Sequence, residues 1–214
     1  MDCNPRIWKV EAQIPALSNI DEAVSLLLNG GLIVYPTETF YALGGQTTST
    51  TVIKRIYSVK GRDADKPLPL VAASATDVRR AVGSWPEAAE QLAEAFWPGP
   101  LTLVLAASPA LPSELHLQTG KIAIRISPHP VAVLLAKAAG GLLISTSANI
   151  SGQSAVDHPD DIEPDLLAQI DGLIYAGKLP GRMPSTIVDV STTLPRLVRD
   201  GSIPWELIER TLHL

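Results

Sequence analysis

Three short polar segments carry the side chains best suited to chemistry. They are Tyr35-Pro36-Thr37-Glu38-Thr39, Lys60-Gly61-Arg62 and Ser145-Thr146-Ser147-Ala148-Asn149. Together they offer cations, hydroxyls, an amide and backbone N–H groups, a combination that stabilises phosphate charge. The first and third follow apolar runs that are typical of buried strands, and ligands of open α/β sheets bind beyond the carboxyl ends of the strands. The segments therefore predict a site for a phosphorylated ligand.

Each segment also has a purely structural explanation. Lys60 and Arg62 would favour the C-terminus of a helix through its dipole, and Ser147 and Asn149 are common turn residues. The usual phosphate-loop, dinucleotide, nucleophile-elbow and zinc-protease motifs are absent. Four scattered histidines are expected to be surface or capping residues: His116, His129, His158 and His213. Catalysis must then depend on Lys, Arg, hydroxyls and backbone amides.

The surrounding sequence predicts alternating helices and strands. Helical patterns cover the apolar run Ala23–Leu28, then Ser49–Val59, Thr76–Val82, Pro86–Phe96, Val131–Ala138, Pro159–Ile170 and a last helix from Pro204. Strand patterns cover Leu32–Tyr35, Leu68–Ala73, Leu101–Ala106, Lys121–Ile126, Leu142–Ser145, Leu173–Tyr175, Thr186–Val190 and Arg196–Arg199. Ser18 and Asn19 offer caps for the first helix, and Pro69 would confine its strand to an edge or a bulge. This alternation is typical of one α/β domain with a mixed sheet.

The composition narrows the class of protein. The chain has 214 residues, of which 46% are hydrophobic and 18% charged, enough for one large core. The chain has 17 basic and 22 acidic residues, which give a net charge of -5. This charge does not indicate non-specific electrostatic binding of nucleic acid. The single Cys3 excludes an internal disulfide and a Cys-x-x-Cys metal site. No signal-like start or long apolar run is present, so we expect a cytoplasmic protein without a membrane partner or a protein-bound metal.

Seven motifs taken together resemble the YrdC family of threonylcarbamoyl-AMP synthases. In order, they are Tyr35-Pro36-Thr37-Glu38-Thr39, Lys60-Gly61-Arg62, Trp97-Pro98-Gly99-Pro100-Leu101-Thr102, Ala123-Ile124-Arg125, Ser147-Ala148-Asn149, Pro184-Ser185-Thr186 and Leu197-Val198-Arg199-Asp200-Gly201. Each motif alone is weak, but their order is specific. The resemblance implies an α/β fold with a twisted mixed sheet, flanking helices and a concave, positively charged cleft. It divides the chain into an N-terminal extension (1–18), a YrdC-like domain (19–205) and a helix end (206–214).

The resemblance also implies roles for nine residues. On the ATP side are Lys60, Arg62, Ser147, Asn149 and Arg199, with Lys60 and Arg62 as the catalytic pair. On the threonine side are Thr37, Arg125, Ser145 and Ser185. These roles make physical sense, because Lys and Arg donate to phosphates and an arginine can hold a carboxylate with two parallel hydrogen bonds.

The implied reaction joins L-threonine, bicarbonate and ATP, carried with Mg²⁺, into threonylcarbamoyl-AMP and releases pyrophosphate. The implied partner is the transferase complex that modifies tRNA, and a weak direct tRNA contact is also compatible with the resemblance.

Some positions depart from the family pattern. The usual Tyr-Gly-Leu is Tyr41-Ala42-Leu43, and Glu38 replaces an aspartate. Lys121 stands where a threonine is expected, and Val71 stands where a histidine is often found. These changes fall mainly on the threonine side.

Three other functions compete with the synthase. A carbamoyl-adenylate-forming domain of hydrogenase maturation would carry Cys-x-x-Cys zinc modules, which this chain lacks. A YciO-type paralogue that binds RNA without catalysis is favoured by Ala42, but Lys60, Arg62, Ser147 and Asn149 favour the synthase. The third alternative is a nucleotide-binding regulator.

Overall fold

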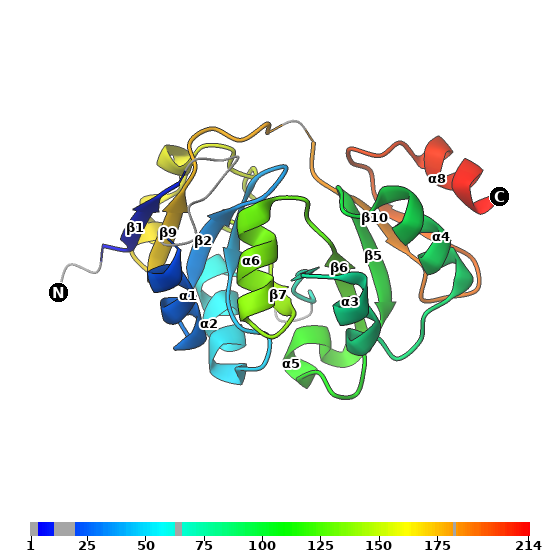
Figure 1. The fold of residues 1–214 in the computed structure, drawn as a ribbon, viewed down its shortest axis with the longest axis horizontal. Coiled ribbons are helices and arrows are strands. Elements are labelled where there is room, and N and C mark those ends of the chain that lie inside the picture. Colours follow the sequence, from blue (N-terminus) through cyan, green and yellow to red (C-terminus); the bar gives the residue numbers. More distant parts are fainter. Residues whose placement is uncertain (1–3, 11–19, 63–65, 182) are drawn as a thin grey trace.

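The computed structural model describes residues 4–10, 20–62, 66–181 and 183–214. Figure 1 shows an elongated molecule with the two chain termini at opposite ends. The strands form two mixed sheets, one toward the N-terminal end and the other toward the C-terminal end. The predicted α/β fold is confirmed, although the strands divide between two sheets instead of forming one.

The first sheet has the strand order β1-β9-β2-β3-β8. Its strands are β1 (Arg6–Lys9), β9 (Gly172–Tyr175), β2 (Ile33–Pro36), β3 (Tyr41–Gly44) and β8 (Thr146–Ser147). β1, β9 and β2 run parallel, whereas β3 and β8 are antiparallel to their neighbours. β1 comes from the segment that the sequence analysis treats as an extension, and here it forms an edge of the sheet.

The second sheet has the order β11-β10-β5-β6-β4-β7. Its strands are β11 (Arg196–Arg199), β10 (Thr186–Asp189), β5 (Leu101–Ala106), β6 (Lys121–Arg125), β4 (Leu70–Ala72) and β7 (Leu142–Ile144). β4 lies between β6 and β7, so the prediction of an edge or bulged strand is wrong. The reason is that Pro69 precedes the strand, where no ladder donor is needed. Its carbonyl instead accepts the Ser145 N–H at 2.8 Å.

Helices pack around both sheets. They are α1 (Asp21–Leu28), α2 (Thr50–Lys60), α3 (Ala75–Ala81), α4 (Glu87–Phe96), α5 (Ser113–His116), α6 (Pro130–Ala138), α7 (Pro164–Leu167) and α8 (Trp205–Leu212), with 3-10 turns η2 (Leu117–Thr119) and η3 (Pro159–Asp161). The prediction of one helix over Pro159–Ile170 is wrong, because Pro164 lacks an N–H and disfavours helix in the residue before it.

Capping chemistry sets two of the helix ends that matter for the site. The Ser49 hydroxyl accepts the Val52 N–H at 3.3 Å at the start of α2, and Gly61, with a φ of 54°, ends it. For α1, the predicted caps Ser18 and Asn19 lie outside the described residues, and the capping residue Ile20 makes no side-chain cap. His129 caps α6, as expected for a histidine outside a metal site.

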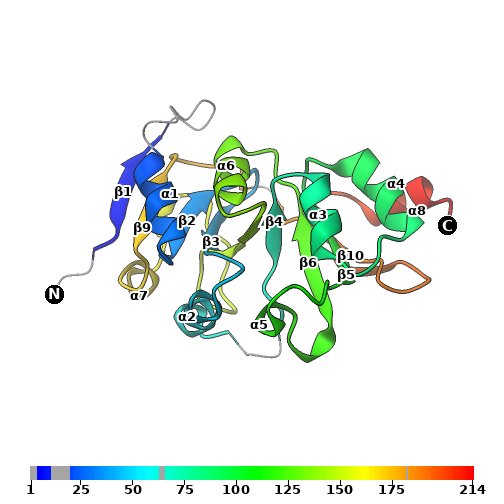
Figure 2. The same ribbon diagram turned by 60° about the horizontal axis from the view of Figure 1, so that its bottom comes forward.

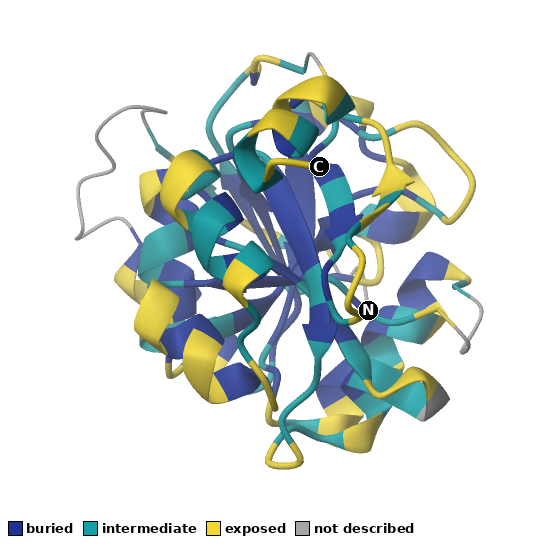
Figure 3. Cartoon of the chain, turned by 90° about the vertical axis from the view of Figure 1, so that its right-hand side faces the viewer, coloured by how far each residue is buried: buried dark blue, intermediate teal, exposed yellow. Residues whose placement is uncertain are grey.

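The core consists of two apolar clusters on opposite faces of the sheets. α1 and α6 cover one side, and α2 and α5 lie on the other (Figure 2). Along β2, the side chains of Ile33 and Tyr35 pack in the cluster under α1 and α6, and the side chain of Val34 packs in the cluster with α2 and α5. This alternation is typical of a strand. Figure 3 shows that the inner strands are buried while the helices expose their outer faces. The edge strands β1 and β11 are largely exposed.

The two sheets meet where β3 and β7 lie beside each other. Gln46 and Leu143 form an isolated bridge there, and the Ile144 N–H donates to the Gly45 carbonyl at 3.0 Å. This junction brings strand ends from both sheets to one place.

Candidate functional site

A cavity of about 390 Å³ lies between the strand ends of both sheets. Eight of the nine predicted site residues line it: Thr37, Arg62, Arg125, Ser145, Ser147, Asn149, Ser185 and Arg199. Thr37 follows β2, Arg125 ends β6 and Ser145 follows β7, which places them where ligands of α/β sheets usually bind. Residues more than 160 positions apart in the sequence thus share one cavity.

The charge of the cavity is its most informative property. Arg62, Arg125 and Arg199 supply three guanidinium groups, and no carboxylate is among the described residues that line it. Partial burial, followed by the charge of Arg125, lowers the pKa of Arg199, so these two cations act on each other. Because the whole chain carries a net charge of -5, this local excess of cations indicates an anionic ligand.

Lys60 is the predicted site residue that does not line the cavity. Its side chain is buried, and its ammonium donates to the Ser147 carbonyl at 2.6 Å. It also donates to the Asn149 carbonyl at 2.7 Å and to the Asn149 side-chain oxygen at 3.2 Å. Burial, followed by the charge of Arg62, lowers the pKa of Lys60 to about 8. In this structure Lys60 therefore holds the 147–149 loop instead of facing a ligand.

Two residues of the 147–149 loop, Ser147 and Asn149, line the cavity. The Ser147 hydroxyl donates to the Asn149 side-chain oxygen, and the Asn149 amide donates to the Gln153 carbonyl at 2.6 Å. Both side chains are thus engaged within the loop and with Lys60.

Arg62 and Arg199 approach the cavity from different elements. Arg62 follows the end of α2 and donates to the carbonyls of Lys66, at 3.1 Å, and Pro67, at 3.0 Å. Arg199 ends β11 and donates to the carbonyl and hydroxyl of Ser185 at 2.7 and 3.1 Å. These contacts aim both guanidinium groups while leaving them on the cavity wall.

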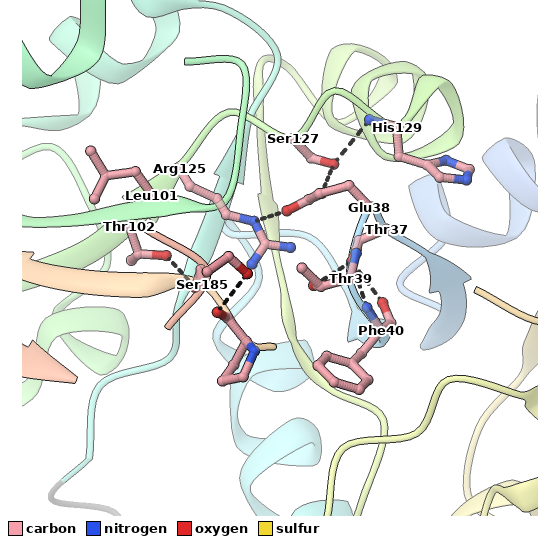
Figure 4. A network of polar contacts seen from close by, with 12 residues as sticks. Thr37, Glu38, Thr39, Phe40, Leu101, Thr102, Arg125, Ser127, His129 and Ser185 are labelled. Carbon is pink, nitrogen blue, oxygen red and sulfur yellow. Dashed lines mark hydrogen bonds and ion pairs between the residues drawn. The ribbon is translucent and has the colours of Figure 1, made fainter. Parts of the chain in front are cut away.

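A chain of polar contacts holds Arg125 on the threonine side of the predicted site (Figure 4). Its Nε lies 3.3 Å from Glu38 Oε1, and both side chains are only 14% exposed. The other Glu38 oxygen accepts the Ser127 hydroxyl, whose oxygen in turn accepts the His129 N–H at 3.1 Å. Glu38 thus links Arg125 to the start of α6. Burial lowers the pKa of His129, and Glu38 acts against that shift.

The hydroxyls of the threonine side have different surroundings. Thr37 is buried, and its hydroxyl donates to the Phe40 carbonyl at 2.6 Å inside its own turn. Ser185 shares a 2.9 Å hydrogen bond with Thr102, which also lines the cavity. The sequence analysis quoted Thr102 within a motif but gave it no role in the site. The Ser145 hydroxyl is buried close to the Tyr35 phenol, whose pKa is raised by burial and lowered in part by that hydroxyl.

The positions that depart from the family pattern are not equivalent. Val71 and Ala42 line the cavity, and Val71 stands opposite Arg125 in the pairing of β4 with β6. Lys121 lies at the other end of β6 and forms an ion pair with Asp189 at 2.9 Å. Only Val71 and Ala42 can therefore shape the ligand site directly.

Two properties of the described residues concern metal binding and membrane insertion. These residues contain no group of three or more His, Cys, Asp or Glu side chains placed to hold a metal ion. They also contain no helix with the length and apolar character needed to cross a membrane.

Comparison with known proteins places the chain in a family. A model of the Sua5, YciO and YrdC proteins, described as telomere recombination, matches residues 25–201. The chain is 39% identical over 188 residues to a threonylcarbamoyl-AMP synthase of Vibrio cholerae, covering 86% of this chain and 98% of that protein. It is 35% identical over 190 residues to a threonylcarbamoyl-AMP synthase of Pyrococcus abyssi, covering 89% of this chain. It spans only 56% of that longer relative.

Solved structures agree with this relationship. Pyrococcus abyssi Sua5 complexed with L-threonine superposes with a TM-score of 0.91 at 33% identity, covering 96% of this chain and 60% of that one. Escherichia coli YciO superposes with a TM-score of 0.86 at 26% identity, covering 94% and 97% of the two chains. The predicted family is therefore confirmed: this chain belongs to the Sua5/YciO/YrdC family.

Proposed function

We propose that this chain synthesises L-threonylcarbamoyl-AMP from L-threonine, bicarbonate and ATP, for the modification of tRNA. The threonine amine and bicarbonate combine to an N-carboxylate with loss of water. That carboxylate then attacks the α-phosphorus of ATP, and the bond to pyrophosphate breaks. The single observation that carries the proposal is the convergence of three guanidinium groups on a cavity whose described lining residues include no carboxylate. The names of the V. cholerae and P. abyssi relatives support the same activity.

The work asked of the protein is electrostatic and positional. Two anions, the N-carboxylate and ATP, must approach each other, and negative charge must be held as the phosphoryl group is transferred. Arg62 and Arg199 are suited to the phosphates, since guanidinium groups pair with phosphate oxygens in two-pronged geometry. Arg125, fixed by Glu38, is suited to the carboxylate of the amino acid. Lys60 contributes by holding the 147–149 loop, whose Ser147 and Asn149 line the cavity.

Mg²⁺, tRNA and the cellular location are also part of the proposal. We treat Mg²⁺ as a component of the ATP substrate, bound by the phosphates. The product would pass to the tRNA-threonylcarbamoyl transferase complex in the cytoplasm. The net charge of -5 disfavours stable binding of tRNA by this chain.

The test is pyrophosphate release measured with each substrate omitted in turn, and with serine or valine in place of threonine. We expect release to need ATP, bicarbonate and threonine together, and to favour threonine over its analogues. A missing hydrogen-bond partner at a buried polar site costs about 1–3 kcal/mol. Equal release with all three amino acids would remove the threonine assignment. Nucleotide binding without any release would favour the YciO-type or regulatory alternatives.

A further inference from the structure

One guanidinium and two hydroxyls form a chain of hydrogen bonds along a wall of the cavity. Arg199 donates to the Ser185 hydroxyl at 3.1 Å, and the hydroxyl oxygens of Ser185 and Thr102 lie 2.9 Å apart. Figure 4 shows the Thr102 side chain directed toward Ser185. All three residues line the cavity, and Thr102 and Ser185 are only 4% and 3% exposed. The two hydroxyls therefore lie at the ligand surface but are largely shielded from bulk water.

Strand pairing fixes the positions of these side chains. Thr102 belongs to β5, and Ser185 directly precedes β10, which runs parallel to β5. The Thr186 N–H donates to the Pro100 carbonyl at 3.0 Å at the start of this pairing. Arg199 ends β11, which is the neighbour of β10 in the same sheet, and it also donates to the Ser185 carbonyl at 2.7 Å. Three adjacent strands thus hold the three side chains in contact.

The two hydroxyls have one proton more than their internal hydrogen bonds use. A hydroxyl carries one proton and two acceptor lone pairs, whereas a guanidinium only donates. Arg199 therefore occupies one lone pair of Ser185. The contact between Ser185 and Thr102 uses one of their two protons. Neither hydroxyl has a further hydrogen-bond partner among the described residues, so the second proton is available to a ligand in the cavity.

The nearby charges favour Ser185 as the hydroxyl that donates to the ligand. Partial burial and then the charge of Arg125 lower the pKa of Arg199, so the two guanidinium groups are close together, and Arg199 contacts Ser185. These cations attract the acceptor groups of a ligand to the surroundings of Ser185. A hydroxyl that accepts from a cation is also a stronger donor. When Thr102 donates to Ser185, both lone pairs of Ser185 are occupied and its proton is directed elsewhere.

We propose that Thr102 is a positioning residue: its hydroxyl donates to Ser185, so that the Ser185 proton is donated to an acceptor oxygen of the amino-acid substrate. This inference rests on the proposed function, which supplies that substrate. Thr102 acts through Ser185 and needs no contact with the ligand of its own. Arg199 keeps its bonds to the Ser185 carbonyl when Thr102 is changed, so ATP binding does not depend on Thr102.

The test is a double-mutant cycle of Thr102→Val and Ser185→Ala. Valine keeps the branched shape of threonine and removes the hydroxyl. L-threonine alone is titrated into each protein by calorimetry, and the KM values for threonine and ATP are measured by pyrophosphate release. We expect Thr102→Val to weaken threonine binding about fivefold, the effect of one hydrogen bond between uncharged groups, and to leave the KM for ATP unchanged. Thr102→Ser, which restores the hydroxyl, should bind threonine like the wild type.

The double variant shows whether Thr102 acts through Ser185. Residues that act through one another depart from additivity in such a cycle. If Thr102 only positions Ser185, the double variant should bind threonine as weakly as Ser185→Ala alone. If the effects of the two single changes multiply, Thr102 acts independently of Ser185 and the inference is overturned. Unchanged threonine binding and KM in Thr102→Val would overturn it as well.

Thr186→Val is the matched control for a purely structural loss. Thr186 is fully buried next to Ser185 in the chain and is not among the residues that line the cavity. Its hydroxyl donates to the Ile203 carbonyl at 2.7 Å and accepts the Ile203 N–H at 2.9 Å. The control should therefore melt at a lower temperature and bind threonine like the wild type. If Thr102→Val behaves in the same way, the role of Thr102 is structural and the inference is wrong.

Direct binding distinguishes this inference from the proposed function. If the wild type releases no pyrophosphate but threonine binding shows the expected cycle, the proposed function fails and the role of Thr102 stands. If release has the expected substrate requirements but Thr102→Val has the threonine affinity and KM of the wild type, the function stands and the role of Thr102 is wrong. A wild type that neither binds threonine nor releases pyrophosphate would contradict both.

Discussion

At the scale of single residues, Lys60 is a buried cation whose donors all point at the 147–149 loop. We expect Lys60→Met to leave those oxygens without a donor and to lower the free energy of unfolding by about 1–3 kcal/mol. Pyrophosphate release should also fall, because the loop that lines the cavity is displaced. Chemical denaturation beside the activity assay checks both. Lys54→Met, at an exposed position of the same helix, is the control and should change neither.

The pKa of Lys60 predicts a dependence of stability on pH. The pKa is lowered to about 8 in the folded protein, against a usual value of 10.5. Between these values the unfolded chain binds more protons, so the contribution of Lys60 to the free energy of unfolding rises as pH rises. The difference in stability between the wild type and Lys60→Met should therefore increase from pH 8 to pH 10. A difference that stays constant across that range would contradict the lowered pKa.

Arg125 combines a ligand role with a structural one. We expect Arg125→Ala to raise the KM for threonine and to lower the melting temperature, because Glu38 loses its partner in a largely buried place. Adding Glu38→Gln should restore much of the melting temperature without restoring the KM. Arg125→Lys should rescue the KM poorly, because an ammonium cannot make two parallel bonds. An unchanged threonine KM in folded Arg125→Ala would show that Arg125 is only structural.

At the scale of elements, the C-terminal end of α2 sets the directions of the Lys60 and Arg62 side chains. Gly61 has a φ of 54° and lies between Lys60, which turns inward, and Arg62, which lines the cavity. A side chain is strained in this conformation by about 1–2 kcal/mol. Gly61→Ala should therefore lower stability by about that amount and raise the KM for ATP. Gly120→Ala, at a φ of 63° and also with open space around it, is the control. It should lower stability similarly and leave the KM for ATP unchanged.

At the scale of the whole molecule, residues from both sheets line the cavity, and the two sheets meet beside it where β3 contacts β7. Arg125 comes from one sheet, and the 147–149 loop begins in a strand of the other. A ligand at one hundred times its Kd stabilises the folded state by about 2.7 kcal/mol. We expect ATP and threonine to slow amide hydrogen exchange in strands of both sheets, measured by mass spectrometry. Protection confined to one sheet would contradict a site built by both.

The helices and strands that sequence periodicity predicted well are those that bury an apolar face. β5 has the predicted bounds, Leu101–Ala106, and α2 differs from its prediction by one residue at each end. β3 and β8 were missed because they are short and rich in small or polar residues, so local pattern does not distinguish them from turns. Their strand geometry comes from pairing with each other and with β2.

The sequence by itself indicated most of the elements in their order and the polar segments at the ends of buried strands, which follow from apolar periodicity, caps and side chains grouped within a few positions. The resemblance to the family indicated eight of the residues that line the cavity. Only the tertiary structure decided the division into two sheets, the inward turn of Lys60 and the complete burial of Tyr35. The physical reason is that burial and hydrogen-bond partners depend on residues far apart in the chain. Lys60 and Asn149 are 89 positions apart, and no local pattern shows that one will satisfy the other.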